Sequence, residues 1–105
     1  MSCRRDKPRG VGGGDGRAGG GATWCRSASA TNAHGPATPS GLISTPGVGG
    51  LTLGGGIGHL PRKCGLTIDN LLEAELVLAS GERVRASADE HPDLYWAIRG
   101  GGGNF

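Results

Sequence analysis

The sequence contains few of the residues that usually build a hydrophobic core. It has one Phe, one Tyr and two Trp, and Val11 is the only Val, Leu, Ile or Phe between Met1 and Gly41. A chain of 105 residues forms at most one small domain, and its 23 glycines raise the entropic cost of ordering the backbone. We therefore expect low stability, with the apolar core confined to the second half of the chain.

Other absences exclude several classes of protein. No apolar run is long enough to cross a membrane, and no apolar segment follows the N-terminal charges as it would in a signal peptide. Cys3, Cys25 and Cys64 form no CxxC pair and leave one thiol over in any disulfide scheme, which argues against a zinc site and a secreted disulfide framework. We expect a cytoplasmic protein with no membrane partner and no metal.

Residues 1–21 form a low-complexity segment rich in Gly and Arg, which we expect to be disordered. An RNA-binding tail is the alternative interpretation. However, the arginines are few, no aromatic residues lie between them, and the whole chain carries a net charge of only +2, so we expect no nucleic-acid partner. The formal GxGxxG from Gly14 to Gly19 has no predicted strand before it and no helical pattern after it, so it does not indicate a dinucleotide site.

The second half of the chain predicts a hairpin followed by a short helix. Leu71–Leu78 alternates in part, with Leu72, Ala74, Leu76 and Leu78 on one face, and Ser80-Gly81 is a turn signal before a second strand at Glu82–Ser87. Pro92 suits the first position of a helix that Gly100 ends. These elements predict a mixed α+β fold.

Between them and the N-terminal segment lies a run of glycines, Gly47–Gly58, in which seven of twelve residues are Gly. Glycine lets backbone groups approach a ligand closely, which suits a phosphate or a flat ring. The run has neither the GK[ST] ending of a P-loop nor the Rossmann spacing. Composition alone leaves two interpretations open, a loop that holds an anion or cofactor and a cluster of structural turns.

Gly41–Phe105 (GLISTPGVGGLTLGGGIGHLPRKCGLTIDNLLEAELVLASGERVRASADEHPDLYWAIRGGGGNF) resembles the FAD-binding domain of the berberine-bridge-enzyme-like oxidoreductases, a group of vanillyl-alcohol-oxidase type. The motifs occur in the family's order: Gly-Val-Gly-Gly, a triple glycine, Arg-Lys-x-Gly-Leu, Asp-Asn-Leu, and a Trp-Ala-x-Arg helix leading into a glycine string. Weaker similarity reaches back to Ala22. The resemblance implies a partial FAD-binding domain of PCMH type, with glycine-rich loops, a β-hairpin and a short helix, over residues 22–105 and truncated at its C-terminus.

By this resemblance the cofactor is FAD, and the cofactor-binding residues are Thr45, Gly47, Gly49, Gly50, Gly54, Gly55, Gly56 and Gly58. Asp69 and Asn70 match the family's Asp-Asn pair, for which a turn cap and a ligand contact both remain open. The family's Arg-x-Gly-Gly-His segment, which carries the covalent flavin attachment, is absent, and no catalytic residue is expected in this chain.

The function implied by the resemblance is that of an FAD-binding fragment of a flavin-dependent oxidoreductase. The intact family transfers a hydride from an alcohol, amine or sugar carbon of a small-molecule substrate to FAD, and we expect this chain alone to be inactive. The alternatives are a non-catalytic nucleotide-binding module and an inert fragment of a broken gene. The second alternative is favoured by the Arg/Gly-rich sequence at the N-terminus, where the family has strands.

Overall fold

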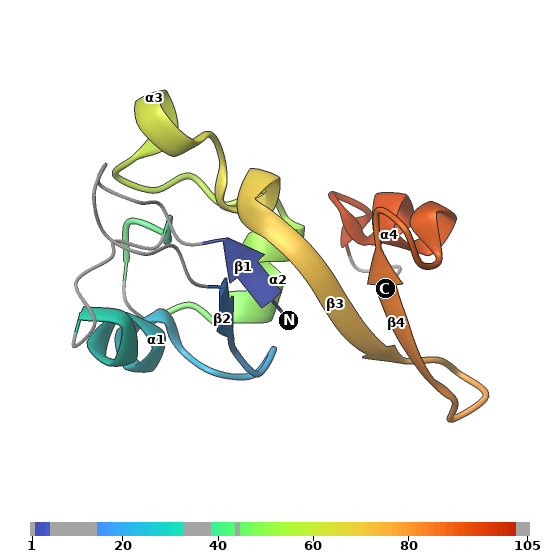
Figure 1. The fold of residues 1–105 in the computed structure, drawn as a ribbon. Helices are drawn as coiled ribbons and strands as arrows, with labels where there is room; N and C mark the ends of the chain where they lie inside the picture. The colour runs from blue at the N-terminus through green and yellow to red at the C-terminus, as the bar shows by residue number, and fades with distance from the viewer. Residues whose placement is uncertain (1, 5–14, 33–38, 44, 103–105) are drawn as a thin grey trace.

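The structure is a computed structural model that describes residues 2–4, 15–32, 39–43 and 45–102. Its described elements, in chain order, are β1 (Ser2–Arg4), β2 (Asp15–Arg17), α1 (Trp24–Asn32), α2 (Val48–Leu53), α3 (Pro61–Cys64), the 3-10 helix η1 (Thr67–Asn70), β3 (Leu71–Val77), β4 (Arg83–Ser87) and α4 (Pro92–Ile98). In the view of Figure 1, α4 lies beside β4 at one end of the molecule, and α1 and α3 lie at the other end. The fold is α+β, as the sequence predicts.

The four strands form one antiparallel sheet in the order β2-β1-β3-β4. Glu73 lies opposite Ser87 and Val77 lies opposite Arg83, so β3 and β4 are paired along their length. The turn between them is closed by Leu78, whose N–H donates to the Glu82 carbonyl and whose carbonyl accepts from the Gly81 N–H, both at 2.9 Å. Gly81 has a φ of 85°, which glycine adopts without strain. The predicted hairpin is confirmed.

The predicted helix is also confirmed, as α4. Pro92 occupies its first turn, and Gly100 follows its end with a φ of 96°. Ile98 is only 1% exposed and forms the core with Ala74 and Ala86, and the partly buried residues packed against this core include Leu76 and Tyr95. On the predicted face of β3, Ala74 is buried, Leu72 and Leu76 are half-buried, and Leu78, just beyond the strand, is exposed. Leu71, which is not on that face, is also buried.

Helices α1, α2, α3 and η1 form where the sequence pattern predicts none, and two of them, α1 and α2, bury side chains in or beside the glycine run. The glycine run, which composition interprets as a loop or a cluster of turns, contains a helix, because Val48–Leu53 is helical with Val48 and Thr52 buried. The expectation that the apolar core is confined to the second half of the chain is wrong at α1, where Trp24 is 3% exposed. A single large side chain, the indole of Trp24, anchors α1. The segment therefore lacks the repeated apolar residues from which an amphipathic helix is predicted.

Part of the segment predicted to be disordered, residues 5–14, lies outside the described residues. Within the same segment, β1 pairs with β2, placing Ser2 opposite Arg17 and Cys3 opposite Gly16, and β1 also joins β3. Among the helices that the structure describes, none has the length and apolar character needed to cross a membrane.

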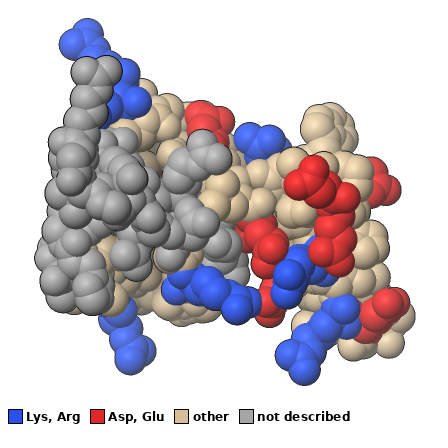
Figure 2. All heavy atoms as spheres, in the orientation of Figure 1, with Lys and Arg blue, Asp and Glu red and all other residues tan. Residues whose placement is uncertain are grey.

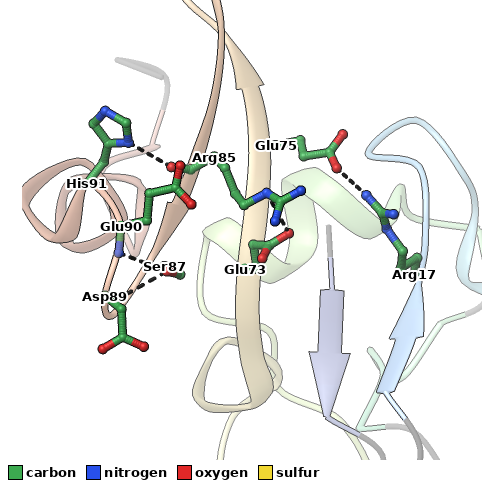
Figure 3. A network of polar contacts seen from close by, with 8 residues as sticks. All are labelled: Arg17, Glu73, Glu75, Arg85, Ser87, Asp89, Glu90 and His91. Atoms are coloured by element: carbon green, nitrogen blue, oxygen red, sulfur yellow. Dashed lines mark hydrogen bonds and ion pairs between the residues drawn. The ribbon is translucent and has the colours of Figure 1, made fainter.

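Ion pairs cross the outer face of the sheet (Figure 3). Arg17 on β2 pairs with Glu75 on β3, and Arg85 Nε on β4 lies 3.5 Å from Glu73 Oε1, a diagonal contact across the hairpin. The same region contains the Ser87 turn, in which Ser87 Oγ accepts from the N–H groups of Asp89 and Glu90. Because Arg17, Glu75 and Arg85 are exposed and only Glu73 is half-buried, the ion pairs add little to stability.

Candidate cofactor-binding site

The glycine run begins with a helix and ends with a turn. Gly47 is the N-cap of α2, Gly49 and Gly50 lie in its first turn, and Gly54 is its C-cap. The chain then reverses through Gly55 and Gly56, whose φ angles are 109° and 72°. Thr45, which precedes the run, is exposed. The predicted site residues therefore lie on two features, the start of α2 and the segment Gly54–Gly58, which we call the glycine turn.

A second segment, Gly20–Trp24, lies against the start of α2. The Val48 N–H donates to the Ala22 carbonyl at 2.7 Å, and the Gly49 N–H donates to the Gly20 carbonyl at 3.0 Å. A Cβ at Gly49 would lie 2.9 Å from the Gly20 oxygen, so the contact requires glycine. Sequence reasoning missed Gly20 as a neighbour of the site, because a contact between two glycines leaves no pattern of apolar residues.

The glycine turn is held from the other side by η1. Thr67 donates twice to the Gly56 carbonyl, from its N–H at 2.9 Å and from its Oγ1 at 3.0 Å. The Ile68 N–H donates to the Gly55 carbonyl at 3.0 Å. A Cβ at Gly56 would lie 2.6 Å from Thr67 Oγ1, and one at Gly58 would overlap the Ser40 carbonyl. Glycine at positions 56 and 58 thus serves close packing within the chain.

Two glycines of the run face open space instead. A Cβ at Gly50 or at Gly55 would meet no described heavy atom within 4 Å. Gly47 and Gly54 are intermediate, since a Cβ at each would lie 3.8 and 3.3 Å from the nearest atom. The run therefore combines an internal packing side with an accessible side near Gly50 and Gly55, as a loop against a flat ligand requires.

Three of the glycine N–H groups in this run donate within the chain. Those of Gly49, Gly54 and Gly55 donate to the carbonyls of Gly20, Gly50 and Thr52 at 3.0, 3.2 and 3.0 Å. A ligand at these glycines would therefore meet the Cα and carbonyl atoms of the backbone rather than a cluster of free N–H donors. Such a surface fits the face of a flat ring better than it fits a phosphate.

Asp69 and Asn70 cap the turn between α3 and η1, as the structural one of the two interpretations expects. Asp69 Oδ2 accepts from the Leu66 N–H at 2.8 Å, and Asn70 Nδ2 donates to the carbonyls of Cys64 and Leu66, both at 2.9 Å. Asp69 Oδ1 also lies 3.9 Å from Arg99 Nη2, which links η1 to the end of α4.

A second glycine string also reaches the run. The Gly100 N–H donates to the Leu53 carbonyl at 2.8 Å, so the string that follows α4 lies at the C-terminal end of α2, next to Gly54. Sequence reasoning recognised this string as a family motif but assigned it no place in the site. The pairing joins residues far apart in the chain, which composition cannot predict.

A pocket of about 300 Å³ adjoins the run, between β2, α1 and the start of α2. Its lining includes Arg17, Ala18, Trp24, Ala30 and Val48, and it contains none of the predicted site residues. Trp24 Nε1 is buried with no hydrogen-bond partner in the described part of the chain. Because that nitrogen is covered, it does not offer a donor to the pocket. The pocket thus lies beside the predicted site residues without including any of them.

The comparisons with known proteins agree with the glycine geometry. Residues 13–87 match the family model described as FAD binding domain. An FAD-linked oxidoreductase of Aspergillus terreus is 56% identical over 73 residues, which are 70% of this chain and 15% of that protein. Berberine bridge enzyme-like 12 of Arabidopsis thaliana is 54% identical over 68 residues, which are 64% of this chain and 12% of that protein.

The fold is similar as well. The crystal structure of 6-hydroxy-D-nicotine oxidase from Arthrobacter nicotinovorans matches with a TM-score of 0.78 and 42% identity, covering 83% of this chain and 19% of that one. The chain belongs to the family of FAD binding domains, and its relatives are FAD-linked oxidoreductases of the berberine-bridge-enzyme-like type. It spans less than a fifth of the length of the curated relatives it matches.

Proposed function

We propose that the glycine run forms one wall of an FAD site in a flavin-dependent oxidoreductase. The proposed cofactor-binding residues are Thr45, Gly47, Gly49, Gly50, Gly54, Gly55, Gly56 and Gly58. The proposal is supported mainly by the accessible side of the run. There, Gly50 and Gly55 leave the backbone open to a ligand, whereas neighbouring glycines are packed against other parts of the chain. The residues present fit a flat cofactor, since no side chain of the run projects at these two positions.

Within this proposal the residues of the chain bind and orient the cofactor. When bound, FAD supplies the capacity to accept a hydride from a substrate carbon. Gly50 and Gly55 admit it closely, and the Thr67 and Ile68 donors hold the turn in place. No residue of the chain is assigned a catalytic role.

The substrate is proposed to be a small molecule with an oxidisable alcohol, amine or sugar carbon. This class of substrate is supported by the similarity to 6-hydroxy-D-nicotine oxidase, whose name states that it oxidises a small molecule. The face shown in Figure 2 has acidic and basic side chains interspersed over the part of the molecule that carries β3, β4 and α4, with no continuous basic surface there for a nucleic acid. We further propose residues 22–105 as the limits of the FAD-binding part and the cytoplasm as its location.

Substituting an accessible glycine tests the proposal. Gly55→Ala would place a methyl group on the accessible side at a φ of 109°, and we expect it to lower the affinity of the chain for FAD at least tenfold. The affinity is measured by quenching of flavin fluorescence, with co-elution of flavin absorbance in gel filtration as a second readout.

Gly81→Ala is the matched control. Gly81 also has a positive φ, 85°, with no described atom within 4 Å of its Cβ position, but it lies in the hairpin turn. Both variants carry a similar backbone strain, so only the first should change FAD binding. Equal affinities in the two variants would contradict the proposal, and no binding by the unaltered chain would favour an inert fragment.

A further inference from the structure

We propose that Thr67 is a positioning residue for FAD: its hydroxyl fixes the glycine turn in the conformation that meets the cofactor. This inference rests on the proposed function, because it presumes that the turn contacts FAD. It concerns a side chain that does not itself touch the accessible side of the run, and it assigns a task to η1 beyond that of connecting α3 to β3.

The geometry places Thr67 directly behind the turn. The residue is 2% exposed, and its N–H and Oγ1 both donate to the Gly56 carbonyl, at 2.9 and 3.0 Å. The next residue, Ile68, donates its N–H to the Gly55 carbonyl and is 7% exposed. Three hydrogen bonds from two adjacent buried residues thus hold two consecutive peptide groups of the turn.

The turn requires such restraint because of its backbone. Gly55 and Gly56 both have positive φ, and glycine is the residue whose backbone has the most freedom to leave a given conformation. Without an external restraint the two peptide groups would rotate among several conformations, and FAD binding would have to supply the cost of ordering them. The Thr67 hydroxyl reduces that cost before the cofactor arrives.

Thr67 is also shaped to the turn. A Cβ at Gly56 would lie 2.6 Å from Thr67 Oγ1 and 2.7 Å from its Cβ, so the threonine side chain occupies the space beside the glycine. The contact is reciprocal, since glycine at position 56 lets Thr67 approach the carbonyl that it binds. The hydroxyl and the close packing therefore act on the same peptide group.

Thr67→Val tests the role of the hydroxyl. The Thr67 N–H still donates to the Gly56 carbonyl, so no buried acceptor loses its last partner and the fold should persist. We expect the affinity for FAD, measured by flavin fluorescence, to fall about fivefold to tenfold, the change expected for one net hydrogen bond. Thr67→Ser, which keeps the hydroxyl, should restore most of the affinity.

Thr52→Val is the matched control. Thr52 is also a buried threonine, 0% exposed, but its Oγ1 has no hydrogen-bond partner within the described part of the chain. Removing that hydroxyl should leave FAD affinity unchanged. A loss of affinity in both valine variants, or in neither, would overturn the inference.

Amide hydrogen exchange without FAD separates this inference from the proposed function. In Thr67→Val the amides of Thr67 and Ile68 should exchange faster than in the unaltered chain, and in Thr52→Val they should not. Unchanged exchange would overturn the restraint itself. If the unaltered chain binds no FAD, the proposed function and the positioning role both fail, whereas faster exchange with unchanged affinity overturns the positioning role alone.

Discussion

Two regions of this molecule are held together in different ways. The hairpin–helix region, residues 71–98, packs side chains of its strands and helix around Ala74, Ala86 and Ile98. The described part of the glycine region, residues 19–60, also buries Trp24 and Val48, but its segments are joined mainly by backbone contacts, such as those from Val48 and Gly49 to Ala22 and Gly20. One small chain thus combines a core that depends on buried apolar side chains with a candidate site that depends on glycines, which have no side chain.

The largest effect is expected in the hairpin–helix region. Ile98→Ala would leave a cavity where the 1% exposed side chain meets Ala74 and Ala86, and such truncations cost about 2–5 kcal/mol. The free energy of unfolding, measured by urea denaturation, should fall by an amount in that range. A loss below about 1 kcal/mol would mean that this core does not dominate stability.

A smaller loss is expected in the glycine region. Gly49→Ala forces a Cβ to within 2.9 Å of the Gly20 carbonyl oxygen, so the two segments must move apart, at about 1–3 kcal/mol. Urea denaturation again gives the change. If the variant is as stable as the unaltered chain, the backbone contact between Gly20 and Gly49 is not a source of stability.

Gly50→Ala, one residue further along α2, should have the opposite effect on stability. Its Cβ would meet no described atom within 4 Å, and Ala favours a helix over Gly by about 1 kcal/mol. We expect a slightly more stable chain that binds FAD less tightly, because the methyl group lies on the accessible side. A gain in stability without loss of FAD affinity would remove Gly50 from the site.

The smallest effect is expected on the outer face of the sheet. Arg85→Ala removes the contact of 3.5 Å with Glu73, but the Arg85 side chain is 53% exposed, so the unfolding free energy should change by less than about 1 kcal/mol. The change should shrink further at high salt. A larger loss would show that the ion pairs in Figure 3 contribute more than surface pairs usually do.

The same comparison explains what could be predicted from the sequence. The hairpin and α4 follow from alternation, Pro92 and the glycines that end each element, since these signals act through neighbouring residues. Helix α2 could not be predicted in this way. Gly49 and Gly50 disfavour a helix locally, and burial of Val48 and Thr52 with the contact to Gly20 overrides that preference.

The candidate site was predictable only in part. The motifs of the glycine run identify the family, and the family match over residues 13–87 confirms it. They do not distinguish glycines that pack, such as Gly56 and Gly58, from glycines that stay accessible, such as Gly50 and Gly55. That distinction depends on Thr67 and Ser40, which the fold brings to the run from other parts of the chain.

The central claim, that FAD meets the accessible side of the glycine run, is tested most directly by titrating the isotopically labelled chain with FAD and following its amide NMR signals. We predict that the largest shifts fall on Gly50, Gly54–Gly58 and Gly100, with none at Gly81 in the hairpin turn. Shifts centred instead on Arg17, Ala18 and Ala30, around the pocket between β2 and α1, would contradict the account.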